Sequence, residues 1–115
     1  MSFASNSGAA GSAHRYRRQL SPKQMEAEVF ARATRALREA PADDAIALAR
    51  ALADNRRLWD AVLAAVLDPA NRLPVALRAQ IASLARTMLR ELEGEAPDPA
   101  FIIEMNDQIA GALWN

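Results

Sequence analysis

The side chains that perform acid–base, nucleophilic or metal chemistry are sparse in this sequence. His14 is the only histidine and cysteine is absent, which leaves no thiolate nucleophile and no His/Cys metal site. The carboxylates fall mainly on expected solvent faces or at helix starts instead of converging with a basic partner. The four glycines stand apart and form no phosphate-binding loop. We therefore expect a protein that is not an enzyme and that holds no cofactor or metal.

Composition predicts one small helical domain. The chain has 115 residues, of which 51% are apolar and only 5% aromatic, a balance typical of Ala/Leu helices rather than β-structure. Its longest apolar run, residues 61–67, is far shorter than the ~20 residues of a membrane span. The N-terminus lacks the apolar core of a signal peptide. A cytoplasmic location without membrane attachment is the expectation.

The first helix is expected to begin just after Ser21. Ser21 to Gln24 resembles a capping box, and Pro22 suits the first helical position. Phe30 lies at the margin of the apolar face that follows, and Pro41 ends the helix. That face consists of Met25, Val29, Ala33, Ala36, Leu37 and Ala40.

A long amphipathic helix is expected over residues 43–68. Asp54 and Asn55 are poor helix formers that could start a separate helix, but the apolar stripe stays in phase across them, so one helix of about seven turns is predicted. The stripe contains Ala45, Leu48, Ala49, Leu52, Trp59, Leu63, Val66 and Leu67.

Asp68 and Pro69 should end this helix and start a hairpin. Asn71 is predicted to form the turn and Pro74 to open the next amphipathic helix. Trp59 is interpreted as the core anchor of the hairpin. For Asn55, a side-chain bridge to a neighbouring turn is the structural interpretation.

The last helix should start at Asp98 and Pro99, a cap followed by proline. Its apolar residues cover more than half of its circumference, so it either lies centrally or leaves an apolar surface. Asn106 lies within the apolar stripe and is interpreted as fixing register. The residues flanking that stripe are Phe101, Ile103 and Trp114.

The fold class predicted is all-α, a small antiparallel bundle of about four helices. Residues 1–19 are expected to be a flexible, basic and disordered tail, and residues 20–115 a single helical domain.

Several segments resemble the FlaF family of flagellar biosynthesis proteins from alphaproteobacteria. They are D-N-R-R-L-W at 54–59, D-P-A-N-R-L-P at 68–74, L-R-A-Q-I-x-S-L at 77–84, and an ending with Asn106, Ile109, Gly111 and Leu113. Tyr16 also matches, so the resemblance covers residues 16 to 113. Many relatives have a tryptophan shortly after the S-L pair, where this chain has Arg86-Thr87-Met88.

The resemblance implies a cytoplasmic protein that flagellin synthesis and export require. It would act on flagellin in a chaperone-like way and oppose FlbT, which restrains flagellin translation. FlbT and the export apparatus are further candidate partners, and both a monomer and a homodimer stay open. The candidate partner-binding residues are Tyr16, Asn55, Arg57, Phe101, Ile103 and Trp114.

Direct binding of flagellin messenger RNA is the alternative function. Residues 1–25 carry bases and no acid, whereas residues 91–115 carry acids and no base. The overall net charge is zero, which argues against nucleic acid because such affinity comes largely from phosphate neutralisation. The basic residues in question are Arg15, Arg17, Arg18, Arg56 and Arg57.

Glu26 and Arg56 form the last hypothesis. Helix phase places both within apolar arcs, and two opposite charges pointed into one core should pair. In the competing interpretation, Glu26 complements the helix dipole and Arg56 extends outward to solvent.

Overall fold

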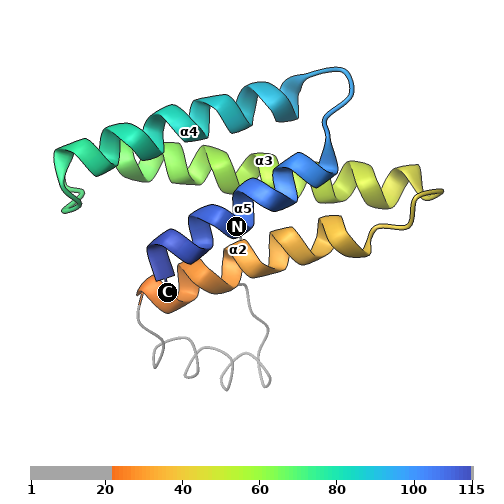
Figure 1. The fold of residues 1–115 in the computed structure, drawn as a ribbon, viewed down its shortest axis with the longest axis horizontal. Coiled ribbons are helices and arrows are strands. Elements are labelled where there is room, and N and C mark those ends of the chain that lie inside the picture. Colours follow the sequence, from red (N-terminus) through yellow and green to blue (C-terminus); the bar gives the residue numbers. More distant parts are fainter. Residues whose placement is uncertain (1–21, 115) are drawn as a thin grey trace, which may run out of the picture.

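The computed structural model describes residues 22–114, and the side chains of residues 27–111, as four α-helices without a strand. The all-α prediction is therefore confirmed. The tail predicted for residues 1–19 and the cap residue Ser21 lie outside the described residues. The helices are α2 (Pro22–Glu39), α3 (Ala45–Leu67), α4 (Val75–Glu93) and α5 (Pro99–Trp114) (Figure 1).

The long helix α3 is continuous, as its unbroken apolar stripe indicated. It begins where the Asp44 carboxylate accepts a hydrogen bond from the Ala47 amide at 2.9 Å, a side-chain cap for an otherwise unpaired donor. It ends before Asp68, whose backbone is extended because Pro69 disfavours the helical conformation in the residue before it.

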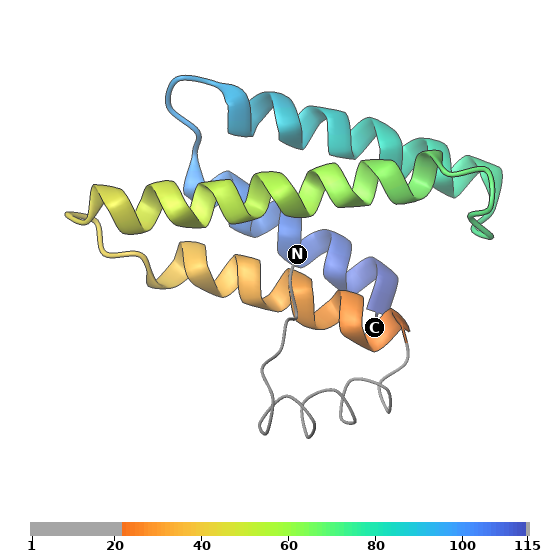
Figure 2. The same cartoon turned by 180° about the vertical axis from the view of Figure 1, so that it is seen from behind.

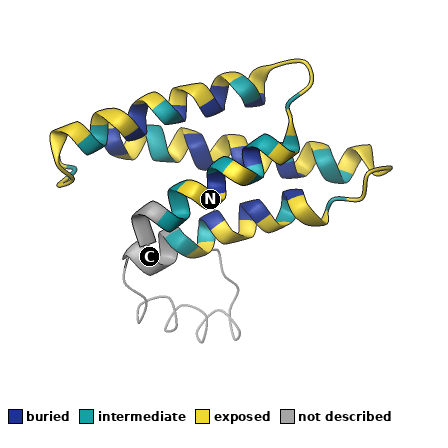
Figure 3. Ribbon diagram, in the orientation of Figure 1, coloured by how far each residue is buried: buried dark blue, intermediate teal, exposed yellow. Residues whose placement is uncertain are grey.

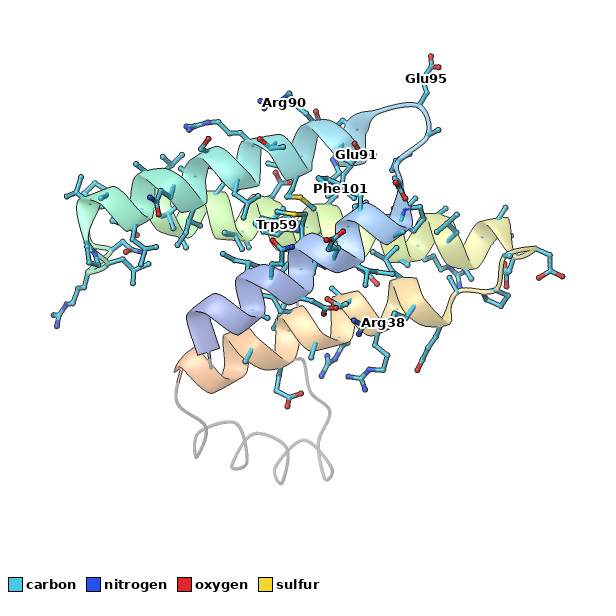
Figure 4. All side chains as sticks on the ribbon, in the orientation of Figure 1. Arg38, Trp59, Arg90, Glu91, Glu95 and Phe101 are labelled. Atoms are coloured by element: carbon cyan, nitrogen blue, oxygen red, sulfur yellow. The ribbon has the colours of Figure 1, made fainter. Side chains whose placement is uncertain are left out.

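The start of α5 is fixed to the end of α4. The Asp98 carboxylate accepts hydrogen bonds from the amides of Ala100 at 3.0 Å and Phe101 at 3.4 Å. The Asp98 amide in turn donates to the Glu91 carboxylate at 2.8 Å, and Figure 4 shows Glu91 near the connection between these helices. The direction in which α5 leaves α4 is therefore set by side-chain hydrogen bonds.

Three helices lie in a row and the fourth crosses them. In Figure 1, α4, α3 and α2 follow one another and run in alternating directions, while α5 passes obliquely in front of α3. Figure 2 shows α3 from behind, with α5 on its far side. The closest helix pairs are α3 with α4, α2 with α3, and α2 with α5. One face of α3 is therefore covered by α5 and the opposite face is open.

The core lies between α5 and the row of helices, and Figure 3 shows buried positions on all four helices. Trp59, Met88 and Ile102 are its largest fully buried apolar side chains. Phe30, expected at the margin of its helix, is only 4% exposed and meets the Trp59 ring edge to face, with centroids 5.6 Å apart. The predicted margin was wrong because α3 and α5 flank α2 together and bury a wider arc than one neighbour would.

Candidate interaction surfaces

Two amide side chains occupy the centre of the core. Asn55 of α3 and Asn106 of α5 are both fully buried, and the Asn106 Nδ2 donates to the Asn55 Oδ1 at 2.7 Å. The Asn55 Nδ2 donates to the carbonyls of Ala33 at 3.0 Å and Ala51 at 2.8 Å. Asn55 therefore bridges α3 to both α2 and α5.

Asn106 connects the network to the aromatic core. Its Oδ1 accepts from the Trp59 Nε1 at 2.9 Å, and its Nδ2 also donates to the Thr34 hydroxyl at 3.1 Å. The Thr34 hydroxyl donates to the Phe30 carbonyl at 2.8 Å. Among the described side chains, no buried nitrogen or oxygen lacks a partner. A fully satisfied network of this kind fixes the relative positions of the helices that contribute to it.

This network corrects one candidate binding residue. Asn55 was proposed to contact a partner, but its side chain has no exposed surface and all its hydrogen bonds are internal. The structural interpretation of Asn55 as a side-chain bridge agrees with its bond to the Ala33 carbonyl of α2. Trp59, 0% exposed, also lies in the core, and Figure 4 shows it between the helices.

The turn between α3 and α4 is built by side chains that bind the end of α3. The Asn71 Nδ2 donates to the Ala65 carbonyl at 2.9 Å, and its Oδ1 accepts from the Leu73 amide at 2.9 Å. Arg78 donates through Nε to the Val66 carbonyl at 3.0 Å and through Nη2 to the Asp68 carbonyl at 3.1 Å. These bonds satisfy carbonyls that a helix end leaves unpaired. Pro74 is the N-cap of α4, one position earlier than the first-residue place predicted for it.

The charged residues on α3 are exposed. Arg56 donates to the Glu93 carboxylate of α4 at 3.5 Å, and the two side chains are 54% and 52% exposed. The predicted burial of Arg56 is therefore wrong, because the buried stripe of α3 is centred on Asn55, one position away. Arg57 pairs with Asp54 on the same helix. Glu26 lies on α2, but its side chain is outside the described ones.

The apolar residues that flank the buried stripe of α5 pack against the core but are only half-buried. Phe101 and Ile103 both contact the main apolar cluster while keeping part of their surface accessible. Ile102 between them is fully buried. The side chains of Trp114 and Tyr16, the other candidate residues, lie outside the described ones. The described part of α5 therefore offers two accessible flanks, one on each side of Ile102.

Sequence reasoning missed the most exposed large apolar side chains. Leu67, Leu73 and Val75 lie at the α3–α4 turn, and Ile46 lies at the other end of α3. Leu67 was assigned to the buried stripe, but it is the last residue of α3 and extends past the packed helices. The run of apolar residues on both sides of Pro74, outside either stripe, was the available signal for Leu73 and Val75.

Other kinds of site are not evident in the described part of the chain. Within residues 22–114, no group of three His, Cys, Asp or Glu side chains is placed to hold a metal ion. No helix among those residues is long and apolar enough to cross a membrane.

The comparisons with known proteins identify the family. The family model described as flagellar protein FlaF matches residues 12–113, which is nearly the whole chain. No curated protein and no solved structure matches. The chain belongs to the FlaF family, as its segments indicated, and is a flagellar protein.

Proposed function

We propose that this member of the FlaF family binds flagellin in a chaperone-like way, promoting flagellin synthesis and export in opposition to FlbT. The observation that carries the proposal is the family match across residues 12–113.

The two flanks of α5 support a helix-against-helix contact. Phe101 and Ile103 are two residues apart and therefore about 200° apart around the helix, so they face different sides of α5. Both are apolar and half-buried. An amphipathic segment of flagellin could cover either flank with its own apolar face, which is a common mode of peptide recognition. Trp114, eleven residues or about three turns further along, would extend the Ile103 side.

Two of the five arginines proposed to bind messenger RNA already form ion pairs within the protein. Arg56 pairs with Glu93 and Arg57 with Asp54, so each positive charge already has an acidic partner. The remaining candidates, Arg15, Arg17 and Arg18, lie outside the described residues. Nucleic-acid affinity depends on phosphate neutralisation by basic side chains, and these two arginines already have carboxylate partners.

A retention assay at physiological salt separates the two functions. Immobilised full-length chain is exposed to flagellin and, separately, to flagellin leader RNA, and we expect only flagellin to be retained. Retention of RNA without flagellin would contradict the proposal. The double variant Ile103→Ser/Trp114→Ser should reduce flagellin retention at least tenfold while circular dichroism shows a folded chain.

The matched control is Ile46→Ser, which removes an exposed apolar side chain from the far end of α3 and should leave flagellin retention unchanged. If the α5 variant is folded and retains flagellin fully, the flanks of α5 are not the binding surface. In that case Tyr16 and the basic segment around it become the next candidates.

A further inference from the structure

Three exposed apolar side chains gather at the turn between α3 and α4. Val75 is 79% exposed, Leu67 52% and Leu73 38%. Figures 1 and 3 show this turn at one end of the helix row, where the ribbon is coloured mostly as exposed. With Arg72, which is also exposed and lies in the same turn, they form what we call the tip surface. Exposed apolar residues that cluster in this way, rather than singly, mark interaction sites.

The tip surface is held rigidly. Asn71 and Arg78 hydrogen-bond to the carbonyls that end α3. The Asp68 carboxylate accepts from the Ala70 amide at 2.9 Å, and the Asp68 carbonyl accepts from the Asn71 amide at 2.9 Å. A turn with this many internal bonds loses little conformational entropy on binding, which favours affinity.

The charge around the tip surface is mostly positive. Residues 69–90 contain four arginines and no acidic residue. Arg78 is bonded to backbone carbonyls, whereas Arg72 and Arg86 have no ion pair among the described residues. Arg86 is exposed and lies eleven residues after Val75, about three turns along the same side of α4.

The nearest acids offset this charge only in part. Asp68 binds the backbone of its own turn, and Asp60 lies about two turns back along α3. Glu93, at the far end of α4, is already paired with Arg56. The apolar side chains are thus accompanied by the free positive charges of Arg72 and Arg86.

We propose that the tip surface docks an amphipathic helix with an acidic polar face from a partner protein. The apolar face of that helix would cover Leu67, Leu73 and Val75, and its carboxylates would meet Arg72 and, further along α4, Arg86. Such a helix supplies both the apolar anchors and the opposite charge that the surface lacks. The inference does not depend on flagellin binding, which was placed on α5.

Charge argues against the two occupants that this chain itself could supply. In a two-fold dimer the same patch meets itself, which would bring the Arg72 residues of the two copies together. The segment outside the structure at the N-terminus, residues 1–21, carries three arginines and a histidine but no acid. Like charges oppose both contacts.

Two model peptides test the proposal. One is an amphipathic helix with leucine on one face and glutamate on the other, and the second has lysine in place of every glutamate. Each is titrated into the isotope-labelled full-length chain and followed by amide NMR spectra. We expect the glutamate peptide to shift amides of residues 67–79 and to bind at least tenfold more tightly than the lysine peptide.

Variants localise the contact. Val75→Ser should weaken the glutamate peptide at least tenfold, and Arg72→Glu should remove the preference for glutamate over lysine. Ile46→Ser is the matched control, an apolar residue of similar exposure on α3, and should bind as the wild type does. These positions are exposed, so the substitutions should leave the urea midpoint of unfolding nearly unchanged.

The proposal is overturned if neither peptide binds, if the shifted amides lie elsewhere, or if Ile46→Ser weakens binding as much as Val75→Ser. Self-association of the wild type that Val75→Ser abolishes would assign the surface to a second copy instead. Flagellin retention is measured on the same variants. A chain that binds the glutamate peptide at the tip surface but not flagellin supports this inference and refutes the proposed function. A chain that retains flagellin but does not bind the glutamate peptide supports the proposed function and refutes this inference.

Discussion

Replacing Thr34 by valine tests whether the buried amide network stabilises the bundle. The Thr34 hydroxyl accepts from the Asn106 Nδ2 at 3.1 Å and donates to the Phe30 carbonyl at 2.8 Å. Valine keeps the shape of the side chain but leaves one Asn106 amide hydrogen without that acceptor in a fully buried site. An orphaned buried donor costs about 1–3 kcal/mol, so Thr34→Val should lower the free energy of unfolding by this amount.

Thr87 supplies the matched control. Its hydroxyl makes the same kind of bond, to the carbonyl four residues earlier, Ser83, at 3.1 Å, but on the exposed face of α4. Thr87→Val should change stability by no more than ~0.5 kcal/mol. Urea unfolding of the wild type and both variants, followed by circular dichroism, gives the comparison. Equal urea midpoints for Thr34→Val and Thr87→Val would refute the reasoning.

A double-mutant cycle then isolates the bond itself. Asn106→Ala leaves the Trp59 Nε1 and the Asn55 Oδ1 without their partner, and two orphaned groups should cost about 2–6 kcal/mol. In that background Thr34→Val has no Asn106 amide to orphan and should cost less. Independent residues add to within about 0.5 kcal/mol, so additive effects of these two substitutions would show that the bond contributes nothing.

Three further stability predictions use the same assay. Trp59→Ala should cost about 3–5 kcal/mol as a large core truncation, and a variant that melts like the wild type would show that its burial contributes little. Arg78→Ala should cost about 1–3 kcal/mol because it takes the donor from the Val66 carbonyl at the end of α3, while the exposed Arg86→Ala should be nearly neutral; equal effects would mean that the Arg78 bond to this carbonyl is dispensable. Arg56→Ala should cost less than ~1 kcal/mol, because its pair with Glu93 is exposed, and a loss near 3 kcal/mol would restore a buried role for Arg56.

Helix boundaries were predictable because they depend on local chemistry. Asp44 and Asp98 cap α3 and α5 with their own side chains, and Pro69 stops α3 without help from distant residues. Even the continuity of α3 through the poor helix former Asn55 followed from the phase of its apolar residues. Each of these features depends on residues that lie within a few positions of one another in the sequence.

The rotation of α3 about its axis was not predictable from the apolar pattern. The predicted stripe was defined by apolar residues and so placed Arg56 near its centre, whereas the buried face of α3 is centred on Asn55. The position of Asn55 depends on Ala33 of α2 and Asn106 of α5, which are 22 and 51 residues away. Contacts at such separations follow from packing, and a single sequence does not display them.

The network also determines which part of α5 stays accessible. Because α5 has apolar side chains around most of its circumference, burial of apolar area alone would allow several orientations of similar energy. Turning α5 by one position would exchange Ile102 for Ile103 at little apolar cost, but it would take Asn106 away from Trp59 and leave that indole donor unpaired. A buried polar contact is thus able to select one orientation where hydrophobic burial does not. Phe101 and Ile103 remain on the flanks of α5 because Asn106 holds the helix in this register. The proposed function therefore predicts that loosening the network alters flagellin retention even though the network residues are buried.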